Sequence, residues 1–200
     1  MTKRVYISAD YDSDKGDREV VEVLNKWGED DFHKVDFVDM AKVASGSVSN
    51  YPNCRICDLK REFNRQINAS SAAIFIVGDK TATRTAGSAC KRMDGQCFCT
   101  PYKENIYGIQ NCKYDTVEWA DPNGDIGYIN SWSYIEHEFR QAVRSGKKII
   151  IFYNSTRKES NWLPNYMSEY EDIAMPFWTI NQNGYRIGNY QLIKSALGYE

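Results

Sequence analysis

The composition is that of an ordinary globular chain of 200 residues, long enough for one domain that buries roughly 70% of its unfolded surface. Its 25 basic and 27 acidic residues give a formal net charge of -2, which excludes a broad electrostatic basis for binding nucleic acid or an anionic membrane. No apolar run approaches the ~20 residues of a membrane span, and no secretory leader precedes the first strand-like segment. We therefore expect a single, soluble, cytoplasmic domain over residues 1–200.

The first part of the chain alternates short apolar runs with stretches of helical periodicity. Three runs have the composition of buried strands: residues 4–8, 35–40 and 72–77. Two stretches between them carry apolar side chains at helical spacing: Val20, Leu24 and Trp27 in the first, and Ile56, Leu59, Phe63 and Ile67 in the second. Residues 41–53, which are rich in Ser, Gly and Asn, predict a loop before the second helix.

The second part begins with a long irregular segment. Residues 85–132 have no clear periodicity and hold turn formers and four of the cysteines, so we expect an insertion within the domain, forming a lid or flanking subdomain beside the ligand crevice. Regularity returns with a helix around 135–143, closed by Gly146, and a buried strand at 147–153. A last strand over 175–180 and a last helix over 190–197 complete the expected order.

This alternation predicts a three-layer α/β fold, with a central parallel sheet and helices on both faces. Ligands of such sheets bind at the carboxyl ends of the strands. Four polar residues follow or end the predicted strands and are candidates for ligand binding: Ser8, Asp10, Asp39 and Thr81. We expect the loops that carry them to surround one crevice, together with the start of the helix that carries Glu138.

The segment 134–138, with the sequence YIEHE, is the strongest candidate for chemistry. Tyr134 and Glu138 are four residues apart and share a helical face, so an aromatic ring could flank a carboxylate at the crevice, whereas Glu136 points elsewhere. The alternative is that Glu138 is a solvated helix residue and Tyr134 a packing aromatic, which is the commoner role of such residues.

Several familiar kinds of site are not indicated. The sequence SADY after the first strand matches neither the dinucleotide fingerprint nor a phosphate-binding loop, which disfavours Rossmann and NTPase chemistry. The two histidines, His33 and His137, belong to no metal-binding helix motif or nucleophile elbow, and we expect both at the surface.

The six cysteines allow one alternative to free thiols. Cys54 and Cys57 have zinc-knuckle spacing, and two of four further cysteines could complete a four-thiolate site: Cys90, Cys97, Cys99 and Cys112. However, Cys97 and Cys99 are unusually close, and Cys57 lies where the second helix starts. Unpaired, reduced thiols and no metal are the favoured interpretation.

Three blocks of sequence resemble one family, the TIR-like proteins of bacterial Thoeris antiphage systems, which have a flavodoxin-like fold. Residues 3–8 (KRVYIS), followed by a polar loop and Tyr11, are similar to the family's opening strand KRVFFS. Residues 76–81 (IVGDKT) are similar to its V-x-I-G-x-x-T, and residues 134–139 (YIEHEF) with 145–150 (SGKKII) to its W-V-x-x-E-I helix and G-x-K-I-I strand. Two departures are a Tyr at 134 in place of Trp and the long insertion at 85–132.

The resemblance implies an activity. In catalytic TIR domains the glutamate of this helix is required to cleave the nicotinamide–ribose bond of NAD, and the motif carries that role to Glu138, with Tyr11 and Tyr134 among the substrate-binding residues. NAD is then the substrate, and no cofactor or metal is needed. The resemblance further implies a cyclic ADP-ribose product that signals to a downstream effector, and protomers that associate with one another.

Two other classes of function stay open at this point. One is a non-catalytic TIR-like module for protein interaction or nucleotide binding, and the other a flavodoxin-like or nucleoside-processing domain. An enzyme is expected to place Glu138 and Tyr134 in a concave pocket beside the loop after Ser8. An interaction module is expected to leave Glu138 on an open, convex face.

Overall fold

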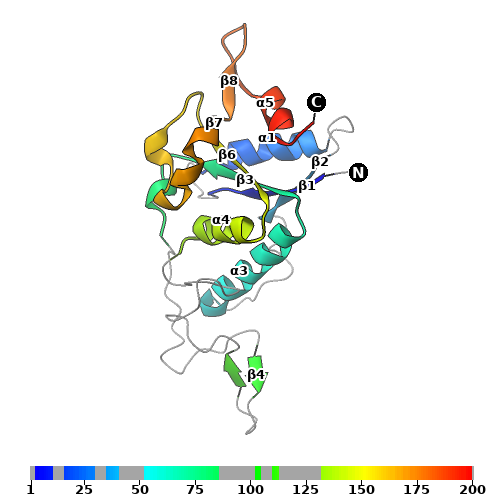
Figure 1. Cartoon of the computed structure of the whole chain (residues 1–200), viewed down its shortest axis with the longest axis vertical. Helices are drawn as coiled ribbons and strands as arrows, with labels where there is room; N and C mark the ends of the chain where they lie inside the picture. The colour runs from blue at the N-terminus through cyan, green and yellow to red at the C-terminus, as the bar shows by residue number, and fades with distance from the viewer. Residues whose placement is uncertain are drawn as a thin grey trace.

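A computed structural model describes residues 3–10, 16–29, 35–40, 52–85, 102–104, 110–112 and 132–199. Its centre is a parallel sheet of five strands: β1 (Lys3–Ser8), β2 (Val35–Asp39), β3 (Ala72–Val77), β6 (Lys148–Tyr153) and β7 (Met175–Pro176). The strands lie in the order β2-β1-β3-β6-β7 (Figure 1). The sheet is therefore wound in both directions from β1, which confirms the predicted α/β class.

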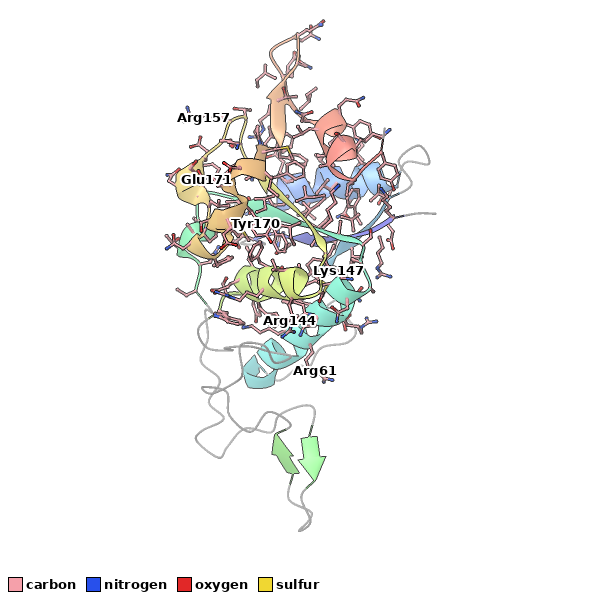
Figure 2. The ribbon with its side chains drawn as sticks, viewed as in Figure 1. Arg61, Arg144, Lys147, Arg157, Tyr170 and Glu171 are labelled. Atoms are coloured by element: carbon pink, nitrogen blue, oxygen red, sulfur yellow. The ribbon has the colours of Figure 1, made fainter. Side chains whose placement is uncertain are left out.

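Helices cover both faces of the sheet. α1 (Arg18–Gly28) and α5 (Tyr190–Ala196) lie on one face, and α3 (Pro52–Asn68) and α4 (Tyr134–Arg144) on the other (Figure 1). Each face has its own apolar cluster, and the side chains drawn in Figure 2 fill the space between the layers. All six residues of β3 are buried, as expected for a central strand covered on both sides.

The apolar pattern of each strand assigns its residues to one face or the other. In β1, Val5 and Ile7 belong to the cluster under α1, whereas Tyr6 belongs to the cluster under α3 and α4. Because successive side chains of a strand alternate between faces, Ser8 lies on the face that α3 and α4 cover. This alternation decides which strand-end residues can meet Glu138.

Local signals explain the ends of α4. Ser133 is its N-cap, since the Ser133 hydroxyl accepts a hydrogen bond of 3.1 Å from the Glu136 N–H. The helix ends before Gly146, which has a φ of 61°, a conformation that favours glycine. The predicted helix and its closure at Gly146 are thus confirmed.

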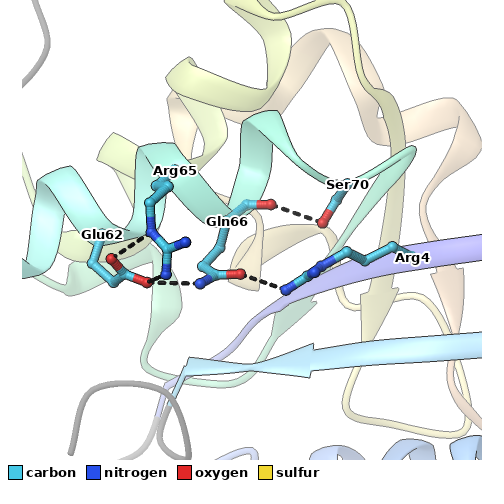
Figure 3. A network of polar contacts seen from close by, with 5 residues as sticks. All are labelled: Arg4, Glu62, Arg65, Gln66 and Ser70. Atoms are coloured by element: carbon cyan, nitrogen blue, oxygen red, sulfur yellow. Dashed lines mark hydrogen bonds and ion pairs between the residues drawn. The ribbon is translucent and has the colours of Figure 1, made fainter. Parts of the chain in front are cut away.

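Polar contacts on the α3 side fix this helix to the sheet (Figure 3). Arg4 of β1 donates to Gln66 Oε1 at 2.7 Å, and Gln66 Nε2 donates to Glu62 Oε1 at 2.7 Å. Arg65 completes the chain by donating to both oxygens of Glu62, and this contact lowers the pKa of the Glu62 carboxyl. These contacts link the C-terminal half of α3, the helix that also carries Lys60, to β1.

The C-terminal region departs from the prediction of one strand over 175–180. β7 covers only Met175–Pro176, and Trp178–Ile180 forms a separate strand, β8, which pairs antiparallel with β9 (Arg186–Gly188). The break falls at Phe177, whose N–H still donates to Tyr153 O of β6 at 2.9 Å, whereas its C=O accepts from the Asn189 N–H at 2.8 Å, just after β9. The β8–β9 hairpin then projects from the body of the molecule (Figure 1).

The segment between β6 and β7 contains two 3-10 helices, η3 (Ser160–Trp162) and η4 (Asn165–Ile173), which the periodicity did not predict. η4 lies beside α4, where Met167 is buried. The predicted last helix is confirmed as α5, with Ile193 and Leu197 buried against the sheet.

The predicted insertion at 85–132 falls mostly outside the described residues. Within it the structure describes β4 (Tyr102–Glu104) and β5 (Gln110–Cys112), which pair antiparallel as a separate two-stranded sheet. Its role as a lid or flanking subdomain, and the pairing or metal binding of the cysteines, stay predictions. No helix among the described residues is long and apolar enough to cross a membrane.

Candidate functional site

Glu138 lies within the protein at the carboxyl edge of the sheet. Its side chain is on the face of α4 that packs on the sheet, and the residue is 5% exposed. The alternative of a solvated helix glutamate is therefore excluded. Glu136 is on a different face, where it forms an ion pair of 2.8 Å with Arg140, as the helical spacing predicted.

The immediate surroundings of Glu138 come from β1 and α3. The hydroxyls of Tyr6 and Ser8 face the carboxyl and favour its charged form, although Ser8 Oγ makes no hydrogen bond of ordinary length and angle. Lys60 favours the charged form as well, through its own positive charge. Burial outweighs these contributions and raises the pKa of Glu138 to about 8, so the carboxyl is mostly protonated at neutral pH.

Lys60 is itself an unusual feature, since the residue is only 1% exposed. Its ammonium group donates to Trp132 O at 3.0 Å, just before the N-cap of α4. A buried ammonium group needs such partners, because an isolated charge in the interior is costly. Lys60 therefore joins α3 to the start of α4 and places a positive charge near Glu138.

His137 corrects a prediction, because it is buried (3% exposed) rather than at the surface. Its Nε2 lies 2.9 Å from Asn64 Oδ1 and 3.2 Å from Lys60 O, so a proton on Nε2 can be donated to either oxygen. The physical reason is the tight packing of α3 on α4, which closes over the ring. His33 lies outside the described residues.

A second buried carboxyl, Asp17, connects three strand-end loops. Asn154, directly after β6, donates to Asp17 Oδ1 at 2.9 Å, and the backbone N–H of Asp10 points to Asp17 Oδ2 at 3.4 Å. At the end of β3, Gly78 approaches so closely that a Cβ there would lie 2.6 Å from Asp17 Oδ1. Burial raises the pKa of Asp17 to about 6, with smaller contributions from Asp10 and Asp79.

The other predicted residues reach the same edge of the sheet but not the same site. Asp10 pairs with Arg84. Asp39 accepts from Asn25 of α1 at 3.0 Å, so it lies on the opposite face of the sheet from Glu138. The structure therefore brings Ser8 to Glu138 and keeps Asp39 away from it.

Two further predicted residues have structural contacts of their own. Thr81 Oγ1 accepts from the Gly78 N–H at 2.8 Å, which closes the turn after β3. The ring of Tyr134 packs edge-on against Phe63, with centroids 5.6 Å apart. Tyr11 lies outside the described residues.

Sequence reasoning missed Lys60, Asp17 and Asn154. The burial of Lys60 could have been predicted from its spacing, because it stands four residues after Ile56 and three before Phe63, on the apolar stripe of α3. Asp17 immediately precedes α1 as its N-cap residue, yet its side chain makes no cap hydrogen bond. Nothing in the sequence around Asn154 indicated that its side chain would join two loops.

The chemistry available at this edge is that of carboxyl groups with raised pKa values and nearby hydroxyls. Among the described residues, no three or more His, Cys, Asp or Glu are grouped so that they could hold a metal ion. Comparison of the chain with protein-family models, with curated proteins and with solved structures found no match.

Proposed function

We propose that this chain is a TIR-type enzyme that cleaves the nicotinamide–ribose bond of NAD, with Glu138 as its catalytic residue. The observation that carries the proposal is a single buried carboxyl on the sheet-facing side of α4, beside Ser8 at the carboxyl end of β1. Counted along the chain, the strands of the main sheet have the order 2-1-3-4-5, which is that of flavodoxin-like domains and agrees with the proposed fold family.

The charge of Glu138 has to change for this chemistry. Nicotinamide is a cationic leaving group, and the transition state resembles an oxocarbenium ion that a carboxylate stabilises. With a pKa of about 8 the carboxyl is mostly neutral without substrate. The positive nicotinamide ring, once adjacent, lowers that pKa, so binding of NAD and loss of the proton are coupled. Lys60 acts in the same direction before substrate arrives.

The remaining parts of the proposal rest on the three-block resemblance. We propose a cyclic ADP-ribose product, made when a hydroxyl or ring nitrogen of the bound nucleotide replaces water as the nucleophile, and an effector in antiphage defence that responds to it. Self-association and location in the cytoplasm belong to the same proposal. No metal or cofactor takes part.

One observation favours a second candidate, a non-catalytic module that binds nucleotides or proteins. Glu138 is 5% exposed and does not line the pocket that the described residues form beside α4. It therefore lies outside that pocket and is not on a convex face. As an enzyme, the protein has to admit substrate to Glu138 from the edge of the sheet where Ser8 ends β1.

Incubation with NAD, with and without extract of phage-infected cells, tests the proposal directly. Chromatography of the products is expected to show loss of NAD, release of nicotinamide, and a cyclic or linear ADP-ribose. NAD that is bound but not consumed in the presence of the extract would support the module instead. The extract is included because an enzyme of this kind can require a phage trigger.

A further inference from the structure

A pocket of about 590 Å³ lies on the outer side of α4, between α4 and η4. Glu138 does not line it. The residues that matter for its chemistry are two arginines, three aromatic residues and one acid: Arg140, Arg144, Trp132, Tyr166, Tyr170 and Glu169. Clefts of roughly 300–1,000 Å³ with aromatic walls and a few polar groups are typical small-molecule sites.

The two arginines supply a place for an anion. Arg140 and Arg144 are one helical turn apart on α4, and the guanidinium of Arg140 lies 4.6 Å from the centre of the Trp132 ring. The ion pair of Arg140 with Glu136 is partly exposed, with the two side chains 45% and 17% exposed, so solvent screens it and a bound anion can compete for Arg140. Planar guanidinium groups match phosphate oxygens in pairs, which favours phosphate as the anion.

The η4 side of the pocket supplies flat surfaces. Tyr166 and Tyr170 of η4 pack on Phe139 with ring centroids 5.7 Å and 5.3 Å away, which fixes the positions of both rings. Figure 2 shows Tyr170 on one side of α4 and Arg144 on the other in that view. Burial raises the pKa of Tyr166, so its hydroxyl stays neutral, and this buried hydroxyl has no hydrogen bond of ordinary geometry. Rigid aromatic rings of this kind stack on nucleobases.

The acid limits which anions fit. Glu169 lines the same pocket, and Glu136 already pairs with Arg140, so the two arginines face nearly equal opposite charge. An inorganic anion such as phosphate therefore gains little binding free energy from the net charge of the pocket. A ligand that carries a phosphate at one end and hydrogen-bond donors at the other satisfies both the arginines and Glu169, because ribose hydroxyls and exocyclic amino groups donate to carboxylates.

We propose that this pocket binds a phosphate-bearing nucleotide, with its phosphate on Arg140 and Arg144 and its base against the aromatic wall. The site is separate from Glu138, so it goes beyond the proposed NAD cleavage. It would allow a nucleotide to bind on the outer side of the helix whose sheet-facing side carries Glu138.

Calorimetric titration with AMP, adenosine and inorganic phosphate tests the proposal. AMP is expected to bind more tightly than either fragment, because it alone engages both walls. Arg144→Gln is expected to weaken AMP binding by at least about 10-fold, as loss of a charge-assisted hydrogen bond does. Arg157→Gln is the matched control, since Arg157 is an exposed arginine paired with Glu159 and does not line the pocket.

Three results would overturn the proposal. They are the absence of AMP binding to the wild type, equal weakening in Arg157→Gln, and unchanged affinity in the Arg140→Gln/Arg144→Gln double variant. Glu138→Gln separates this site from the proposed catalytic one. The AMP affinity of Glu138→Gln is expected to be unchanged. Loss of AMP binding in this variant would show that AMP binds at Glu138 instead of in the pocket. Normal AMP binding without NAD cleavage in the presence of the infected-cell extract would contradict the proposed function and support this site.

Discussion

Asn154 Nδ2 donates a hydrogen bond of 2.9 Å to Asp17 Oδ1, and this contact joins the loop after β6 to the start of α1. Asn154 is held in turn by Trp178, whose Nε1 donates to Asn154 Oδ1 at 2.6 Å, and by its own N–H, which donates to Val77 O at 2.9 Å. The carboxyl edge of the sheet therefore has a fixed arrangement of loops, with a buried acid at its centre.

Gly78→Ala is expected to destabilise the protein by about 1–3 kcal/mol, because the new methyl group overpacks against a carboxyl held by two hydrogen-bond donors. A Cβ at this position would lie 2.6 Å from Asp17 Oδ1. Thermal and denaturant unfolding measure the effect. In an Asp17→Ala background the same substitution should cost clearly less, and a penalty of equal size there would mean that another contact is responsible.

The pH dependence of stability is expected to reveal Asp17. Its pKa rises from 3.8 to about 6 on folding, so the folded protein holds this proton more tightly than the unfolded chain. The contribution of protonated Asp17 to the free energy of unfolding is therefore complete below pH 3.8. About 3 kcal/mol of it is lost as pH rises to about 6.

Asp17→Asn isolates this contribution, because Glu138 titrates with the same sign in an overlapping range. The difference in unfolding free energy between wild type and Asp17→Asn should change between pH 4 and pH 6 and be flat above pH 7. A difference that does not vary with pH would show that Asp17 has an ordinary pKa.

The sequence predicted the frame of the fold because its strands and helices have strong periodicity. The apolar runs of β1 and β3 are typical of a parallel sheet covered on both faces, and the spacing around Glu138 predicted its helical face. The site itself was only partly predictable. Strand-end position alone grouped Ser8 with Asp39, whereas the alternation of side chains places them on opposite faces of the sheet.

The features that the sequence did not predict depend on contacts between residues far apart in the chain. Lys60 and Glu138 are far apart in the chain, and their proximity depends on how α3 packs on α4. The split of the last predicted strand at Phe177 likewise depends on a tertiary contact, the hydrogen bond from the Asn189 N–H to Phe177 O. Propensity and spacing carry no information on either contact.

Lys60→Met is expected to raise the pKa of Glu138 further, because it removes the positive charge that favours the carboxylate. A displacement of about 1 pH unit is the expected size for a nearby charge. Carbon-13 NMR of the glutamate carboxyls measures it without any assay of activity. Methionine keeps the unbranched apolar stem and is only one heavy atom shorter, so the fold should persist. An unchanged or lowered Glu138 pKa would show that Lys60 is too far away to act on it.

Glu138→Gln is expected to abolish NAD cleavage while leaving the fold intact. Glutamine keeps the size of the side chain and its contacts with Tyr6 and Ser8, but it cannot offset the charge of an oxocarbenium ion. If that charge contributes a few kcal/mol in the transition state alone, kcat falls by on the order of 100-fold or more with little change in affinity for NAD. The stability of the variant relative to the wild type should rise as pH rises from 4.5 to about 8 and stay constant above that, because only the wild type has a carboxyl whose pKa is raised over this range on folding.

Glu136→Gln is the matched control for this substitution, since Glu136 lies on the same helix two residues away and pairs with Arg140 at the surface. It is expected to leave NAD cleavage within about two-fold of the wild type, because Glu136 lies on a different helical face from Glu138 and its partly exposed pair with Arg140 takes no part in the proposed chemistry. Rates of nicotinamide release and thermal unfolding of both variants, measured side by side from pH 6 to pH 9, give the comparison. Loss of activity in Glu136→Gln but not in Glu138→Gln would show that Glu136, and not Glu138, is the catalytic glutamate. Equal activity in both, in a protein that consumes NAD, would place the catalytic group elsewhere, and Asp10 and Asp17 at the same edge of the sheet would be tested next.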